Sequence, residues 1–327
     1  MKEKILQGVF FAVALSANAQ QTSFPTPKNE HNIFNHLDLS LTAGTTGIGL
    51  DLASPLGDYL QLRAGYSIMP RFEYRTTFEV QVGQDASSSK AKFSRLQGLL
   101  EGVTGKKVDE KVDMIGKPTY HNFKFLIDVF PFKNNKHWHF TAGFFWGPSK
   151  IATAYNPTEE MSSLLAVSIY NNLYEKAINR QPFVTFQMDG QSYVWTDDPE
   201  FLDVLEEKFT QLGRMGVRIG DYKDGTPYII EPDENSMVKA DVRVNAFKPY
   251  IGFGYGGRLI KGNDKYKVSF DFGAMFWGGT PSVIAHDGVD FAKDIENIPG
   301  KVGSYVRLVK AVKVFPVLEF RLTRTLF

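Results

Sequence analysis

Ten charged side chains recur at alternate positions within short apolar segments, and they divide evenly between the two signs. The five carboxylates and five cations are Asp38, Asp51, Asp128, Asp271 and Glu319, and Arg63, Lys124, Lys248, Lys267 and Arg321. A β-strand sends successive side chains to opposite faces, so these charges would share one face of a sheet. Buried charges are tolerated only when they are paired. The set therefore predicts a structural ion-pair network, with a proton or ion path through it as the functional alternative.

Histidines at strand ends or beside carboxylates are the candidates for catalysis. His121 begins one alternating segment, and His286 is followed by Asp287. A lipid-modifying enzyme would place such a base within hydrogen-bond reach of a nucleophile and an orienting acid, and no nucleophile stands at an indicative spacing. We therefore predict no catalytic residues and keep lipid modification as an alternative.

Metal and cofactor sites are not indicated by the remaining motifs. The chain has no cysteine, the run Asp233-Glu234-Asn235 lacks the spacing of a calcium loop, and the other histidines show no ligand spacing. Those histidines are His31, His36, His137 and His139. Gly252, Gly254 and Gly256 alternate within a strand, lack the following helix of a dinucleotide site, and are expected to make room for bulky neighbours. We predict no metal and no cofactor.

The composition and the N-terminus indicate export rather than nucleic-acid binding. The formal charge is +1, from 37 basic and 36 acidic side chains, so no basic surface for nucleic acid is expected. Lys2 and Lys4 precede a mostly apolar stretch at 5–15, and Ala17-Asn18-Ala19 fits a cleavage site, which predicts a signal peptide at 1–19. No later run approaches the ~20 apolar residues of a membrane helix. An exported chain of this kind is a soluble periplasmic protein or a β-barrel.

Period-two alternation favours the barrel. Eight segments alternate, at 36–44, 47–54, 60–68, 121–131, 138–146, 247–256, 266–276 and 318–326. The connections after the second, fourth and sixth are short, whereas those after the third, fifth and seventh are long, at about 73–119, 150–240 and 278–314. Outer-membrane barrels place short turns in the periplasm and long loops outside. We predict an all-β, antiparallel up-and-down transmembrane barrel over 36–327, after a short periplasmic segment at 20–35. Eight strands are expected, ten or twelve remain open, and Pro249 predicts a bulge.

The long connections carry their own structural signals. Amphipathic helices are predicted at 88–103, 159–178, 201–212 and 304–313, the third with Asp198 as its N-cap and Pro199 at its first position. Asp189-Gly190 and Asp224-Gly225 suit hairpin turns. Apolar helix faces have to pack, so we expect a folded cap of partly helical extracellular loops.

The alternating segments, the export signal and a terminal strand ending in Phe327 resemble the small outer-membrane β-barrels of Gram-negative bacteria, of the OmpA transmembrane type. The resemblance covers the eight strands and implies location in the cell outer membrane with lipid as a partner. The leading functional hypothesis is a non-enzymatic barrel that displays the cap for binding or adhesion to a ligand not identified by the sequence. The alternatives are a transporter of an apolar small molecule through the barrel mouth and a lipid-modifying enzyme.

Overall fold

The computed structural model describes residues 36–327, except 133–134, 158–160, 183–184, 189–190, 195 and 197. These residues fall in the compact unit Phe34–Phe327. The predicted signal peptide at 1–19 and the segment 20–35, with His31, lie outside the described residues. Among the helices of the described part, none is long and apolar enough to cross a membrane.

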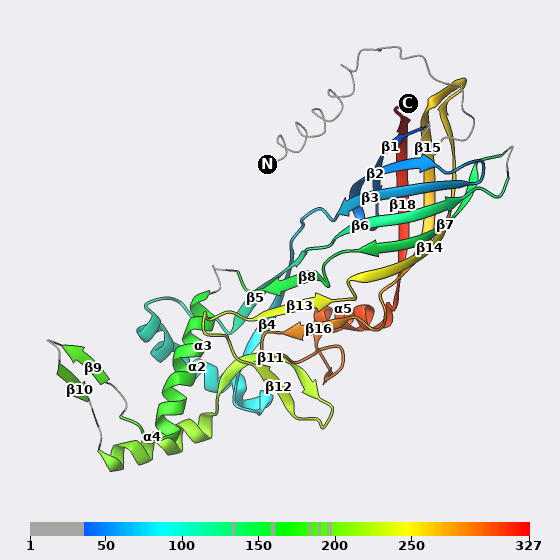
Figure 1. The fold of residues 1–327 in the computed structure, drawn as a ribbon. Helices are drawn as coiled ribbons and strands as arrows, with labels where there is room; N and C mark the ends of the chain where they lie inside the picture. The colour runs from blue at the N-terminus through cyan, green and yellow to red at the C-terminus, as the bar shows by residue number, and fades with distance from the viewer. Residues whose placement is uncertain are drawn as a thin grey trace. The chain divides into compact units, whose positions relative to one another are not determined.

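Eight antiparallel strands close into a barrel (Figure 1). They are β1 (Asp38–Gly44), β2 (Gly47–Pro55), β3 (Leu60–Ile68), β6 (His121–Val129), β7 (Trp138–Trp146), β14 (Phe247–Ile260), β15 (Asn263–Phe276) and β18 (Val314–Thr325). Each strand pairs with its predecessor among the eight, and β18 pairs with β1, where Asp38 stands opposite Thr325. The predicted up-and-down barrel is confirmed, with eight strands rather than ten or twelve.

The alternation of the sequence becomes an apolar outside and a mixed inside. On β6, Phe123, Phe125 and Ile127 are exposed, while Lys124 and Asp128, at alternate positions, are buried. Every barrel strand contributes exposed apolar side chains, which we call the belt. The belt comprises Leu41, Ile48, Leu50, Leu52, Leu60, Leu62, Tyr66, Ile68, Phe123, Phe125, Ile127, Val129, Trp138, Phe140, Trp146, Phe247, Ile251, Phe253, Tyr255, Phe270, Phe272, Phe276, Val314, Leu318, Phe320 and Leu322. Its existence follows from the two-residue side-chain period of a strand.

The bulge expected at Pro249 is not where β14 is irregular. Pro249 lies opposite Phe144 within an uninterrupted ladder from β14 to β7, and the register shift falls between Arg258 and Ile260. Pairing of β14 with β15 begins only at Tyr250. Proline, which has no backbone N–H to donate, is tolerated at residue 249 because the hydrogen-bond ladder between β14 and β15 has not yet begun there.

The three long connections, 69–120, 147–246 and 277–313, are called the cap. They contain a second sheet in the order β12-β11-β4-β5-β8-β13-β16, with β17 paired to β11. Its strands are β4 (Tyr74–Val82), β5 (Lys111–Pro118), β8 (Lys150–Tyr155), β11 (Met215–Tyr222), β12 (Pro227–Ile230), β13 (Lys239–Arg243), β16 (Ser282–Ala285) and β17 (Ile295–Glu296). β11 and β12 form the hairpin predicted at Asp224-Gly225. β9 (Thr185–Met188) and β10 (Gln191–Val194) form a separate pair, whose predicted turn at 189–190 lies outside the described residues.

Four helices occur in the described part of the cap, near the predicted positions. They are α2 (Ala86–Thr104), α3 (Met161–Ile178), α4 (Pro199–Leu212) and α5 (Gly300–Ala311). Asp198 caps α4 as predicted, with its Oδ1 accepting from the Glu200 backbone N–H at 3.1 Å. α5 begins four residues before the predicted start at 304, because Gly300 and Gly303 weaken the helical signal there.

The apolar helix faces pack against the second sheet and form a core of the cap. Phe93 and Leu100 of α2 are buried, as are Leu164 and Tyr170 of α3. The sheet contributes a further set to the same cluster, including Val80, Val82, Val112, Met215, Val217, Ile230 and Val283. The Tyr170 hydroxyl donates to the Gly213 carbonyl oxygen at 2.8 Å. The cap is thus a folded structure with its own hydrophobic core.

Candidate functional site in the barrel lumen

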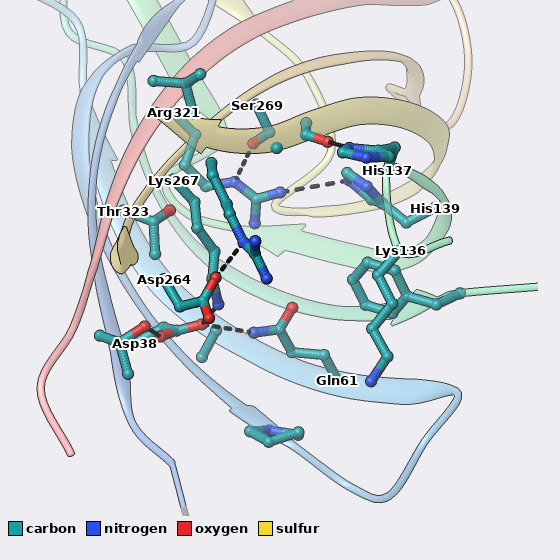
Figure 2. Close-up of a pocket in the computed structure, with 18 of the residues that line it drawn as sticks. Asp38, Gln61, Lys136, His137, His139, Asp264, Lys267, Ser269, Arg321 and Thr323 are labelled. Atoms are coloured by element: carbon teal, nitrogen blue, oxygen red, sulfur yellow. Dashed lines mark hydrogen bonds and ion pairs between the residues drawn. The ribbon is translucent and has the colours of Figure 1, made fainter. Parts of the chain in front are cut away.

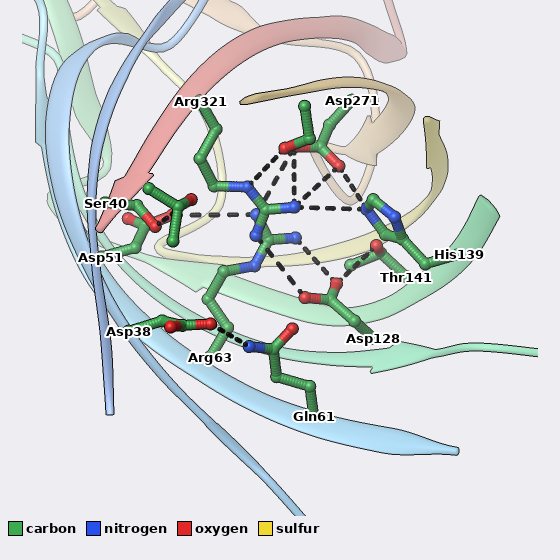
Figure 3. A network of polar contacts seen from close by, with 12 residues as sticks. Asp38, Ser40, Asp51, Gln61, Arg63, Asp128, His139, Thr141, Asp271 and Arg321 are labelled. Atoms are coloured by element: carbon green, nitrogen blue, oxygen red, sulfur yellow. Dashed lines mark hydrogen bonds and ion pairs between the residues drawn. The ribbon is translucent and has the colours of Figure 1, made fainter. Parts of the chain in front are cut away.

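The lumen brings seven of the ten predicted charged residues into one cluster, with Arg63 at its centre. Figure 3 shows Arg63 together with Asp51, Asp128, Asp271 and Arg321. Arg63 donates from Nη2 to Asp128 Oδ1 at 2.9 Å. Its Nη1 lies 3.6 Å from Asp271 Oδ2 and 3.8 Å from carboxylate oxygens of both Asp51 and Glu319. One guanidinium therefore faces four carboxylates, an arrangement that its planar, always charged group suits.

Two further cations complete the pairing. Lys124 Nζ lies 2.8 Å from Asp51 Oδ1 and 2.8 Å from Glu319 Oε2. Arg321 Nη2 lies 3.3 Å from Asp271 Oδ2, and its Nη1 lies 3.7 Å from Asp128 Oδ2. The members are nearly inaccessible to solvent, so each charge depends on its neighbours for the stabilisation that water would otherwise supply.

His139 belongs to this cluster, although its sequence spacing gave no sign of it. Its Nε2 lies 2.6 Å from Asp271 Oδ1 and 3.3 Å from Arg321 Nη2. Thr141, two residues along β7, donates to Asp128 Oδ1 at 2.7 Å. His139 and Asp271 both stand opposite Gly254, on the two sides of β14. A Cβ at Gly254 would lie within 2.4 Å of both side chains, so the predicted space-making role of this glycine fits the geometry.

The remaining three predicted residues lie apart from the cluster. Lys267 Nζ is 3.5 Å from Asp38 Oδ2, and the Asp38 carboxylate also accepts from Gln61 and Thr325. Lys248 has no carboxylate partner among the described residues. Its Nζ donates to Asn122 Oδ1 at 3.0 Å and to the Ala246 carbonyl oxygen at 3.1 Å, and it lies 5.8 Å from the Tyr120 ring centroid.

An apolar layer fills the lumen on the side of the long connections. Leu126, an apolar interruption of the polar face of its strand, points into this layer with Phe145, Tyr250 and Met275. The Phe145 and Tyr250 rings meet edge to face with centroids 5.3 Å apart. Tyr120, Val244, Trp277 and Val317 complete the layer. Charged and apolar layers are thus stacked within one lumen.

The opposite end of the lumen, at the short turns, opens into a cavity of about 1450 Å³ (Figure 2). Asp38, Lys267 and Arg321 line it, together with His137, whose Nδ1 lies 2.6 Å from the Gly256 carbonyl oxygen. The cavity ends at His139 and Arg321, where the charged cluster begins. It forms a vestibule in front of this cluster.

The candidate catalytic histidines have other partners. His286 Nε2 lies 2.9 Å from the Glu231 carbonyl oxygen, and its Nδ1 accepts from the Lys239 backbone N–H at 3.3 Å. Asp287 accepts from the Tyr228 hydroxyl at 2.8 Å, and burial and this hydrogen bond raise the pKa of Tyr228. The His121 ring packs 5.9 Å from the Tyr66 ring. His286 and Asp287 therefore each hold a different part of the cap.

Fold and lumen together define a class: a closed, eight-stranded, up-and-down β-barrel with an apolar exterior, a filled interior and a folded cap. Among solved structures, the chain is similar to Acinetobacter baumannii CarO2, with 14% identity, a TM-score of 0.38 and coverage of 90% of this chain and 99% of that one. It is also similar to Acinetobacter baumannii CarO, with 14% identity, a TM-score of 0.36 and coverage of 91% and 99%. No family model and no curated protein matches the chain. Similarity at this level does not assign a family.

Proposed function

We propose that this chain is a non-enzymatic outer-membrane protein whose barrel is a closed anchor and whose cap is an extracellular binding surface. The observation that carries the proposal is the belt. Its side chains are 36–60% exposed on all eight strands. Soluble proteins rarely expose contiguous apolar patches of more than a few hundred Å², so a belt around a whole barrel fits contact with lipid.

Aromatic pairs at both ends of the belt support the same location. Trp138 and Tyr255 meet at the short-turn end, with centroids 4.8 Å apart. Phe144 and Phe247 meet at the cap end at 5.0 Å, and Trp146 stacks on Phe123 nearby at 6.3 Å. Aromatic girdles at these two levels are typical of membrane barrels.

The filled lumen supports an anchor rather than a pore. An eight-stranded barrel is only wide enough for its own side chains to fill it. Here, a permeating ion would have to displace a paired cluster centred on Arg63 and then an apolar layer centred on Phe145. Because both layers are buried and packed, we propose that the barrel does not conduct in this state.

The cap offers the surface for binding or adhesion. Its helices bury one apolar face and still expose Leu99 on α2, Leu165 on α3, and Phe201 and Val204 on α4. Exposed apolar side chains on a folded structure are candidates for contact with a partner. Transport of an apolar molecule is less well supported because the apolar side chains at the barrel mouth pack on one another. Lipid modification is less well supported because both His286 ring nitrogens face backbone groups.

Fractionation of cells that produce the full chain tests this proposal. We expect the protein in the outer membrane and an epitope inserted at Asp224-Gly225, in the exposed β11–β12 turn, to be detected by antibody on intact cells. The purified protein in a planar bilayer should give no stepwise conductance. Recovery from the soluble periplasm would refute the membrane location, and ion channels of reproducible size would refute the closed anchor.

A further inference from the structure

Helix α5 exposes large apolar side chains even though its other face is already packed. Leu308 is 59% and Tyr305 46% exposed, while Val302, Val306 and Val309 contact the cap core. The Tyr305 ring meets the Tyr74 ring, with centroids 5.2 Å apart. Two residues before Tyr74, Phe72 is 59% exposed. Phe72, Tyr305 and Leu308 are called the α5 patch.

The α5 patch lies at the cap end of the belt. α5 ends at Ala311, and β18 begins three residues later at Val314, a belt residue opposite Phe276. The Trp277 backbone N–H donates to the Lys313 carbonyl oxygen at 3.3 Å, which holds this junction against the end of β15. Since Leu308 is only six residues from Val314, it lies within roughly 20 Å of the belt. The patch thus lies near the end of the surface for which we propose lipid contact.

The charge of the α5 segment has one sign, and Glu73, which follows Phe72, is paired with Lys117 at 2.9 Å. Residues 297–318 include four cations, Lys301, Arg307, Lys310 and Lys313, and no Asp or Glu. Within the described part of the chain, Arg307, Lys310 and Lys313 form no ion pair. Arg307 instead donates to Ser304 Oγ of its own helix at 3.1 Å. A helix with exposed apolar residues and unpaired cations has the character of an interfacial amphipathic helix.

We propose that α5 docks in the headgroup region of the outer leaflet, where Arg307, Lys310 and Lys313 bind phosphate groups of anionic lipid. Tyr305 and Leu308 then face the boundary between headgroups and acyl chains. The argument rests on charge complementarity and on proximity to the cap end of the belt, and it depends on the proposed membrane location. A negative lipid surface attracts such cations over a distance set by salt screening. The helix would thereby fix the cap to the membrane surface.

A single introduced cysteine can report the position of α5, because the chain has no cysteine of its own. Leu308→Cys is labelled with an environment-sensitive fluorophore, and the full chain is reconstituted in phosphatidylcholine vesicles with or without lipid A. With lipid A, we expect a blue shift and quenching by a lipid-attached quencher. Phe270→Cys on the belt is the membrane control, and Lys223→Cys in the exposed β11–β12 turn is the aqueous control.

The phosphate contact is tested by the triple change Arg307→Gln, Lys310→Gln and Lys313→Gln. The Leu308 label should then lose most of its lipid A-dependent shift, as it should in about 1 M salt, where the screening length is about 3 Å. The Phe270 label should not change. Equal immersion of the Leu308 label without lipid A, or an equal shift with free inorganic phosphate, would overturn the lipid-phosphate contact.

The controls separate failure of this inference from failure of the proposed function. A Leu308 label that behaves like the Lys223 label in both kinds of vesicle would overturn the docking of α5 in the membrane surface. The Phe270 label would still report hydrocarbon in that case. A water-exposed Phe270 label would instead refute the membrane location itself.

Discussion

His139 Nε2 lies 2.6 Å from Asp271 Oδ1 across Gly254, which separates their strands in the barrel wall. The contact exists because residue 254 has no side chain. Gly254→Ala would place a Cβ 2.3 Å from Asp271 Oδ1 and 2.4 Å from His139 Nε2. Overpacking of this kind costs typically ~1–3 kcal/mol. Thermal unfolding in detergent should show the loss, whereas Gly98→Ala, in an open position on α2, should be neutral or slightly stabilising.

Arg63 is predicted to contribute more to stability than any exposed lumen cation. Arg63→Met removes the guanidinium that pairs with the Asp128 and Asp271 carboxylates. Removal of one partner from a buried ion pair costs about 3–5 kcal/mol in folding free energy. Lys267→Met is the matched control, because Lys267 is half-exposed where it meets Asp38 and such pairs contribute about 0–1 kcal/mol. Denaturant unfolding of both variants measures the difference. Equal losses would contradict the central position assigned to Arg63.

The cap should be separable from the barrel in stability. Leu164 is fully buried in α3, whereas its neighbour Leu165 is 43% exposed. Leu164→Ala should destabilise the cap by about 2–5 kcal/mol. Leu165→Ala should change it by less than about 0.5 kcal/mol. Limited proteolysis should cut the cap of the first variant faster while the barrel core stays intact, and equal cutting of both variants would argue against the assigned core.

The surroundings of Asp290 predict that the cap becomes less stable in acid. Burial raises its pKa, but hydrogen bonds from Val283 N–H, Ala292 N–H and Lys293 outweigh burial and hold the pKa below the ordinary 3.8. Because the folded-state pKa of Asp290 is lowered, its carboxylate stabilises the cap fully at a pH above its unfolded-state pKa. This stabilisation is lost as the pH falls from 3.8 through the folded-state pKa. Proteolytic or hydrogen-exchange opening of 282–294 should therefore increase below pH 3.8. Asp290→Asn should open more at neutral pH and depend less on pH in that acidic range.

The barrel strands were predictable because each carries its own signal. Leu50 and Asp51, or Phe270 and Asp271, show by alternation alone which face meets solvent or lipid and which meets the lumen. The sorting of short and long connections then indicated the up-and-down order. The apolar lumen layer escaped prediction because Leu126 looks like an interruption of its strand until Phe145 and Met275 are seen beside it.

The role of His139 could not be predicted because it depends on register between distant segments. About a hundred residues separate β7 from β14, and no local pattern indicates that His139 stands opposite Gly254. The second sheet has the same difficulty. Its pairing of β4 with β11 joins Val82 to Met215 across three helices and six strands, whereas the sequence showed only the local turn at Asp224-Gly225.

The central claim is that alternate residues of the barrel wall meet lipid, and a single-cysteine accessibility scan tests it most directly. Spin labels at Phe140, Phe253, Phe270 and Phe320, on four different strands, should collide with lipid-soluble oxygen and not with a water-soluble relaxation agent in reconstituted vesicles. A label at Lys267, facing the vestibule, should collide mainly with the water-soluble agent. Collision of the four belt labels with the water-soluble agent to the same extent as the Lys267 label would contradict the membrane location.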